Sequence, residues 1–216
     1  ASFAVLDPAY TMSVPPMQVM SGAFDTLSHA METYFGTSDS DNVSDDVALA
    51  IMKNTVVNMR RLLKNVNDVQ ARSNLMWDSA MAENGILKCG RLTDFQAHQM
   101  EHQLGAYTDC NHGQGLAVIQ PVYYRHIWND AQDKFARFAK VVFGVDSAEA
   151  GVDALEDFVK ECGLPVKMSQ LKSTVEITPE VLRKVADTCN IIKCGPRELS
   201  RDEIYDILLE CLEPAE

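Results

Sequence analysis

Apolar residues recur at intervals of three and four along almost the whole chain, and this spacing limits the fold more than any other feature of the sequence. Such intervals place apolar side chains on one face of a helix. After Pro15 and Pro16, the pattern predicts a first helix of about 18 residues that ends near Gly36. Further helices are predicted over residues 43–63, 69–85, 95–104, 130–143, 147–162 and 179–189, and another opens at His112 and ends before Pro121.

Residues typical of loops and helix ends separate these segments. The polar residues 37–42 predict a loop, Gly105 predicts the start of a helix end, and Gly-Leu-Pro at residues 163–165 predicts a helix stop. Ser200, with Glu203 three residues later, is typical of a helix N-cap. There is no internal repeat and no linker long enough to separate two domains. The sequence therefore predicts an all-α helical bundle.

Residues 1–6 (ASFAVL) do not fit the helical pattern. They form a short apolar run that ends at Asp7 and Pro8, and such a run predicts a buried strand followed by a turn. A single strand has no partner for its backbone N–H and C=O groups. We therefore expect this strand to belong to a sheet outside the chain.

The charge of the chain limits its partners. Its formal net charge is −12 and its isoelectric point is about 4.8, so nucleic acid and anionic membrane surfaces would be repelled. The six cysteines contain no C-x-x-C pair, which indicates reduced thiols. No apolar stretch approaches the roughly 20 residues that span a bilayer. We expect a cytoplasmic protein that binds neither nucleic acid nor membrane.

Two groups of polar residues could bind a metal ion. Asp25 and His29 are four residues apart on a predicted helix and share one face, while His98, His102 and His112 lie within fifteen residues of one another. An exposed ion pair, or histidines bonded to backbone carbonyls, would explain either group alone. Together they favour a site with one carboxylate and three of the four imidazoles, although spacing leaves open which three. Such ligands suit Fe²⁺, Zn²⁺, Co²⁺ or Ni²⁺, but not Ca²⁺.

Three motifs in this part of the chain strongly resemble the iron-containing (group III) alcohol dehydrogenases, most closely their butanol-dehydrogenase-like branch. They are D-P-A-Y-T-M-S-V-P-P at residues 7–16, D-T-L-S-H at 25–29, and H-Q-M-E-H-Q-L-G-A-Y-T-D-C-N-H-G at 98–113. The resemblance covers residues 1–143, and more loosely the remainder. It implies the all-helical C-terminal domain that this family shares with dehydroquinate synthase-like proteins.

The resemblance also implies roles for individual residues. By position, the metal ligands are Asp25, His29, His98 and His112. His102 corresponds to a catalytic histidine beside the nicotinamide and substrate, and Thr11 to a residue that contacts the cofactor. Cys110 stands where an aliphatic residue is usual, and Glu101 where some members carry a smaller one. Neither departure removes a ligand.

The family's glycine-rich, nucleotide-binding domain has no counterpart in the sequence. Gly113-x-Gly115 directly follows a proposed ligand and lacks the strand-turn-helix context of a dinucleotide site. We therefore expect residues 1–16 to be the last strand and linker of that domain, and residues 17–216 to be the helical, metal-binding catalytic domain. The chain alone should be inactive, and a face left uncovered would favour a homodimer.

The resemblance implies hydride transfer between NAD(P)H and a primary alcohol or aldehyde, with one divalent metal as Lewis acid. An all-helical, metal-dependent hydrolase is an alternative, but phosphohydrolases of that type typically carry an adjacent His-Asp pair, and none of the five histidines precedes Asp. A non-catalytic metal-binding module is another. Among the remaining candidates, Cys189 and Cys194 are interpreted as structural thiols, and His126 as a packing or surface residue.

Overall fold

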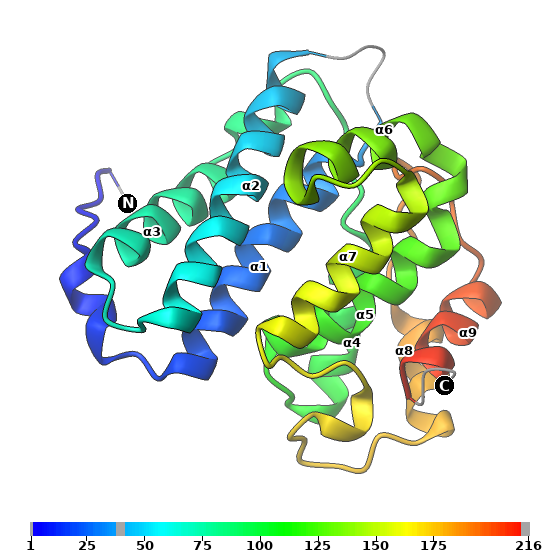
Figure 1. Ribbon diagram of the computed structural model, residues 1–216. Coiled ribbons are helices and arrows are strands. Elements are labelled where there is room, and N and C mark those ends of the chain that lie inside the picture. Colours follow the sequence, from blue (N-terminus) through cyan, green and yellow to red (C-terminus); the bar gives the residue numbers. More distant parts are fainter. Residues whose placement is uncertain (1, 38–41, 213–216) are drawn as a thin grey trace.

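The computed structural model describes residues 2–37 and 42–212. Within these residues the chain is helical and contains no strand, which confirms the predicted all-α fold (Figure 1). The α-helices are α1 (Pro16–Tyr34), α2 (Val43–Lys64), α3 (Val69–Glu83), α4 (Gln96–Thr108), α5 (His112–Ile127), α6 (Gln132–Phe138), α7 (Ala148–Glu161), α8 (Pro179–Thr188) and α9 (Arg201–Leu212). Short 3₁₀ turns are η1 (Pro8–Ser13), η2 (Ile86–Lys88), η3 (Trp128–Ala131) and η5 (Met168–Gln170), and η4 (Ala139–Phe143) is a π-helical turn.

Helix α1 is central to the bundle and packs against α2, α3 and α5 (Figure 1). Helix α4 packs on α5 and α8, and α7 covers α5 and α6. The core between them is rich in aromatic side chains: the Phe35 and Phe135 rings stack at 3.9 Å between centroids, and Tyr124 and Phe138 meet Phe35 edge-on. All four are buried. This core holds α1 and α5 in a fixed relation.

Side-chain caps explain where several helices begin. Asn42 and Asp45 form a capping box at the start of α2. Ser200 and Glu203 exchange backbone-to-side-chain hydrogen bonds of 2.8 and 3.2 Å, which confirms the predicted N-cap of α9. Residues 38–41 of the predicted polar loop lie outside the described residues.

The predicted end before Pro121 is wrong, because α5 continues through this proline to Ile127. Proline inside a helix costs about 3 kcal/mol, since the carbonyl four residues earlier loses its N–H partner. Tyr123 and Tyr124, in the following turn, are fully buried, and each large buried side chain contributes about 1.5–3 kcal/mol. Burial of the turns around Pro121 therefore outweighs its cost.

The predicted strand and two other boundaries also differ from the structure. Residues 2–7 form no strand, and Phe3 and Val5 are exposed, because no second strand pairs with them in the described chain. Helix α4 passes Gly105 and ends at Thr108, because the next residue, Asp109, has a φ of 55°. The helix predicted over residues 130–143 is divided among η3, α6 and η4.

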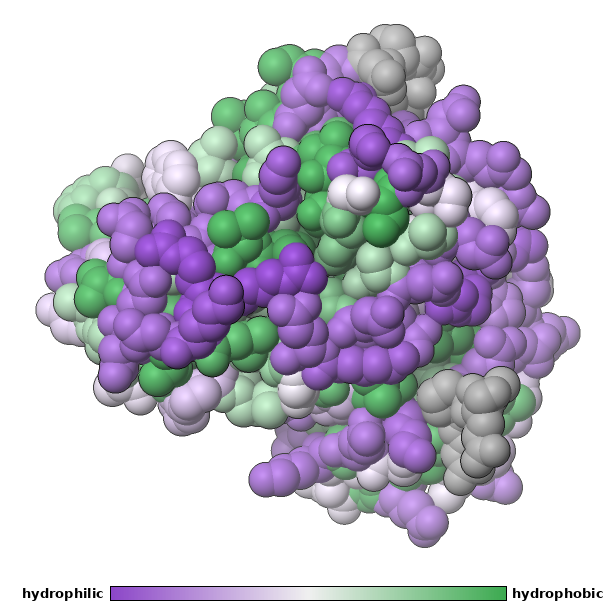
Figure 2. All heavy atoms as spheres, viewed as in Figure 1, coloured by the Kyte–Doolittle hydropathy of each residue, from purple (hydrophilic) through white to green (hydrophobic). Residues whose placement is uncertain are grey.

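Hydrophilic residues predominate on the face shown in Figure 2, with smaller hydrophobic areas between them. Among the described helices, none is both long enough and apolar enough to cross a membrane.

Helices α1 and α5 approach most closely where Gly113 packs on the backbone of Ser21. We expect Gly113→Ala to lower the free energy of unfolding by about 1–3 kcal/mol, because its methyl group would overlap the Ser21 carbonyl and both backbones must shift. Gly22→Ala is the matched control. It lies in α1 with open space at its Cβ position, so it should be neutral or stabilising by up to about 1 kcal/mol. Urea unfolding measures both, and equal effects would contradict the close approach.

Candidate metal centre

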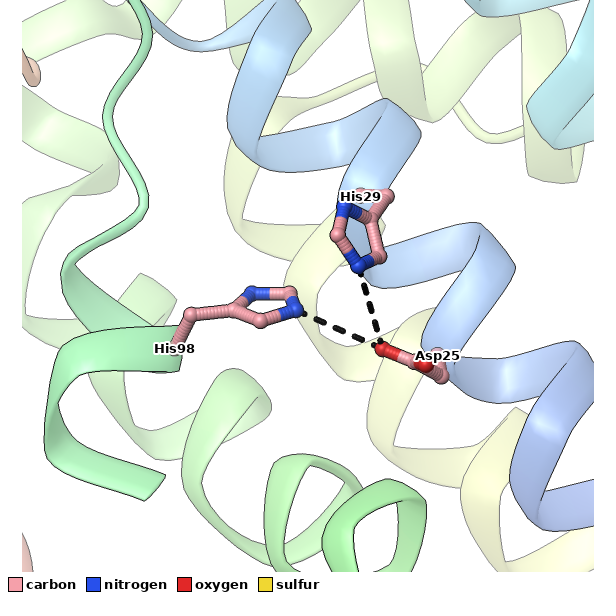
Figure 3. A group of neighbouring side chains, drawn as sticks. All are labelled: Asp25, His29 and His98. Atoms are coloured by element: carbon pink, nitrogen blue, oxygen red, sulfur yellow. Dashed lines mark ion pairs between the residues drawn. The ribbon is translucent and has the colours of Figure 1, made fainter. Parts of the chain in front are cut away.

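Helix α1 supplies the first two residues of the candidate site. It begins at Pro16, where a proline without an N–H is tolerated, and it runs uninterrupted through Asp25 and His29. The four-residue spacing brings His29 Nε2 within 3.5 Å of Asp25 Oδ1, as predicted from the sequence (Figure 3). Both side chains are about three-quarters buried.

Helices α4 and α5 bring two more imidazoles to the same carboxylate oxygen. His98 Nε2 and His112 Nε2 each lie 3.3 Å from Asp25 Oδ1, and Figure 3 shows His98 reaching it from α4. Asp25 Oδ1 and His98 Nε2 are buried and form no properly aligned hydrogen bond. Three imidazole nitrogens from three helices therefore lie within 3.3–3.5 Å of one carboxylate oxygen, and such donors could hold a divalent cation.

Two buried glutamates hold the far sides of these rings. Glu32 Oε2 contacts His98 Nδ1, and Glu101 Oε2 contacts His112 Nδ1. A carboxylate that accepts from Nδ1 leaves Nε2 free to bind a metal ion, which is the usual arrangement around metal-binding histidines. The set of buried, unpaired donors and supporting carboxylates fits a divalent metal.

Sequence reasoning missed Glu32 and treated Glu101 only as a departure from the family pattern. The signal for Glu32 was available, because Asp25, His29 and Glu32 are spaced by four and three residues and share one face of α1. Its partner could not be identified from spacing, since His98 lies on another helix.

Burial and neighbouring charged groups shift the pKa values of the residues in the site. Burial raises the pKa of Asp25, but contacts with His112 and His98 outweigh it and leave that pKa below its usual value. Burial lowers the pKa of His29 to about 4, and the charge of His98 adds to this effect. Contacts with Asp25 and Glu101 raise the pKa of His112 to about 10. For His98, burial lowers the pKa, but Asp25 and Glu32 more than offset it and bring it to about 9.

His102 lies on the open side of this cluster. Its exposed ring stacks on His112 with 5.4 Å between centroids and meets His98 edge-on at 5.7 Å. Burial of part of the ring, and then the charges of His98 and His112, lower the pKa of His102. His102 therefore borders the site without contacting Asp25 in the way that His98 and His112 do.

Thr11 lies outside the histidine cluster. It belongs to η1 and lines a cavity of about 400 Å³ between η1, α1 and α3, together with Gly22 and Thr26 of α1. Its backbone carbonyl accepts a hydrogen bond from the buried Arg72 guanidinium, which anchors η1 to α3. Thr11 therefore lies across this cavity from α1, the helix that carries Asp25.

Phe95 is a further residue at the site that the sequence did not single out. It has a φ of 56°, a left-handed conformation that is uncommon for a bulky residue and costs of order 1 kcal/mol or more. Its ring lies 5.3 Å from His29 and 5.0 Å from His98, measured between centroids. The strained turn therefore places an apolar wall against two of the imidazoles.

The other sequence candidates lie apart from this centre. His126 forms a surface ion pair with Glu210 at 3.0 Å, as expected for a surface residue. Cys189 is buried at the C-terminal end of α8, and burial raises the pKa of its thiol. Cys194 is half-buried and its carbonyl accepts from Thr37.

The sequence that forms this helical fold, with a carboxylate and three imidazoles where three helices meet, matches a protein family. The family described as Fe-containing alcohol dehydrogenase family, C-terminal, matches residues 19–212, and the chain belongs to it.

Individual relatives agree with this assignment. The NADH-dependent butanol dehydrogenase A of Clostridium acetobutylicum is 34% identical over 177 residues, which cover 78% of this chain and 46% of that protein. An NADPH-dependent aldehyde reductase of Escherichia coli is 28% identical over 86% of this chain and 49% of its own length. The crystal structure of the NADH-dependent butanol dehydrogenase A of Thermotoga maritima superposes with a TM-score of 0.86 at 28% identity, and covers 96% of this chain and 55% of that one. The chain therefore spans about half the length of these relatives.

The Glu32 carboxylate is expected to stabilise the site before any metal binds. Glu32→Gln should lower the free energy of unfolding by about 2–4 kcal/mol, because an amide cannot accept from all the N–H groups that meet this carboxylate, and its own N–H₂ would face a donor. Glu210→Gln, which removes an exposed partner of His126, should change it by less than about 0.5 kcal/mol. Chemical unfolding followed by circular dichroism measures the difference. Similar values for the two variants would contradict this role of Glu32.

Proposed function

We propose that this chain is the metal-binding part of a metal-dependent alcohol dehydrogenase or aldehyde reductase, which transfers hydride between NAD(P)H and a primary alcohol or aldehyde. The observation that carries the proposal is the approach of His29, His98 and His112 Nε2 to one buried oxygen of Asp25, within 3.3–3.5 Å. The family match supports the reaction class, and relatives named for NADH-dependent butanol dehydrogenase and NADPH-dependent aldehyde reductase support the substrates and the cofactor.

The proposed ligands are Asp25, His29, His98 and His112, and the proposed metal is Fe²⁺ or Zn²⁺, with Ni²⁺ or Co²⁺ also suited to these donors. A divalent cation held here supplies Lewis acidity toward the substrate oxygen. The chain contributes rigidity, because each ligand comes from a helix packed in the core. It also limits access by water, since the side chain of His98 is only 2% exposed.

His102 is the proposed catalytic residue. Its ring is exposed on the open side of the cluster, where substrate and nicotinamide would approach. Because its pKa is lowered, its imidazole is neutral at neutral pH and can accept or donate a proton at a ring nitrogen. Thr11 is the second proposed cofactor contact, at the cavity between η1 and α1.

The nucleotide would bind largely outside this chain. We assign residues 17–216 to the metal-binding domain, and residues 1–16 to the linker and to a segment that would pair as the last strand of a nucleotide-binding domain when the sheet of that domain is present. The coverage of about half of each relative and the exposure of Phe3 and Val5 support this division. The same exposed apolar residues support a homodimer as the predicted assembly.

Metal content tests the ligand assignment. The purified chain should contain or take up about one divalent metal ion, and His98→Ala should strongly reduce the metal content, because it removes one of the four proposed ligands. His126→Ala is the matched control and should bind metal like the unaltered chain, since His126 pairs with a surface glutamate and not with the proposed ligands among the described residues. Elemental analysis after dialysis measures the stoichiometry. Unchanged metal content in His98→Ala would contradict the proposed set of metal ligands.

Enzyme assays test the reaction. The 216-residue chain should not oxidise NADH or NADPH with butanal, because we assign most of the cofactor-binding site to a domain outside these residues. A longer protein in which a nucleotide-binding domain precedes residue 17 should reduce butanal and lose this activity on His98→Ala. Turnover by the 216-residue chain would refute the division into domains. Hydrolysis of a phosphate ester without aldehyde reduction would instead support a metal-dependent hydrolase.

A further inference from the structure

We propose that Glu101 is a positioning residue that orients His112 toward the metal ion, and that position 115 is a glycine because a side chain there would collide with Glu101. This inference rests on the proposed function, because it concerns the strength of the same metal site. It assigns a role to two residues outside the proposed ligand set.

His112 has a greater need of such support than the other proposed ligands. Its side chain is 38% exposed, compared with 22% for His29 and 2% for His98. It also occupies the first position of α5, so no earlier turn of the same helix packs beside its ring. Packing therefore restricts this ring least, and a polar partner at Nδ1 has the most influence on where Nε2 points.

Glu101 provides that partner from α4. Its carboxylate is 2% exposed, and its Oε2 contacts His112 Nδ1. The other oxygen, Oε1, has the Cys110 thiol at 4.0 Å, which is a weak donor. Burying a carboxylate is costly unless strong donors satisfy it. The imidazole is the only strong donor that the described chain brings to Glu101, so the two groups depend on each other.

Helix α5 leaves space for the Glu101 carboxylate at Gly115. A Cβ atom at Gly115 would lie 2.8 Å from both Glu101 Cγ and Oε1, well inside contact distance. A Cβ atom at Gly105, on the helix that carries Glu101, would lie at an ordinary 3.5 Å from Oε1. Gly115 is therefore the position where a methyl group would displace the carboxylate from His112.

The consequence is a fixed tautomer. When Glu101 accepts a hydrogen bond from Nδ1–H, the proton that His112 gives up on metal binding comes from Nε2, which lies 3.3 Å from Asp25 Oδ1. Glu32 does the same for His98 from α1. The site thus has two supporting carboxylates, one on α1 and one on α4, and each serves a different imidazole.

Zinc affinity of the 216-residue chain tests the proposal, measured by competition with a chelator. Glu101→Leu keeps the volume but removes the acceptor, and it should weaken Zn²⁺ binding about tenfold to a hundredfold. Glu101→Gln should lose less, because its amide oxygen can still accept from Nδ1–H. Gly115→Ala should weaken binding in the unaltered chain but add little to Glu101→Ala, which removes both the Cγ and the Oε1 atoms that the methyl group would meet. Circular dichroism confirms that each variant is folded.

Proton NMR of the zinc-loaded chain separates positioning from general structural damage. The Nδ1–H protons of His98 and His112 should both appear far downfield, protected by Glu32 and Glu101. Glu101→Leu should lose the His112 signal and retain the His98 signal, which serves as an internal control.

Three results would overturn the proposal. A folded Glu101→Leu variant with unchanged zinc affinity would show that Glu101 does not act on His112. Loss of both downfield signals would show a general structural role, and additive effects of Gly115→Ala and Glu101→Ala would remove the link between these residues. If Glu101→Leu does not fold, Glu101→Gln and Gly115→Ala decide by the same measurements. Failure of the unaltered chain to bind Zn²⁺ would instead overturn the proposed metal site itself.

Discussion

The carboxylate of Glu32 joins α1 to the beginning of α4. Its Oε1 accepts from the Ala97 N–H at 2.6 Å, and its Oε2 accepts from the His98 N–H at 3.3 Å and contacts the ring nitrogen Nδ1 of the same residue. The first N–H groups of a helix have no partner within it, and Phe95, at the N-cap position of α4, provides no side-chain cap. Glu32 therefore satisfies buried donors that would each cost about 1–3 kcal/mol if left unpaired.

The geometry of the candidate site depends on this contact. Asp25 and His29 lie on the same face of α1 as Glu32, so the bond that caps α4 also sets the position of His98 relative to them. The close approach of Gly113 to α1 brings α5 to the same place, and Glu101 orients His112 there. Because α1, α4 and α5 share one packed core, the converging nitrogen and oxygen atoms are positioned by the interior of the protein, whereas His102 remains at its exposed edge.

Local patterns predicted the helices well where the pattern and the ends agreed. The apolar spacing and the Ser200 cap agree closely with the helices observed. The strand predicted from the apolar run at residues 1–6 does not form over residues 2–6, because the described chain offers no partner strand. The helix was expected to end at Pro121 because proline breaks isolated helices. Helix α5 continues beyond Pro121 because buried tyrosines stabilise the next turn. These tyrosines contact residues distant in sequence, so the local pattern could not predict their contribution.

The sequence alone determined the all-helical fold class and the pairing of Asp25 with His29, because both depend on the repeat of a single helix. The family resemblance named His112 as the fourth ligand where spacing left His102 equally open. Only the tertiary structure decided that His112 Nε2 lies 3.3 Å from Asp25 while His102 stacks outside, and that Glu32 and Glu101 stand behind the rings. The physical reason is that side chains on one helix are related by its fixed geometry, whereas those on different helices meet only through packing of the whole core.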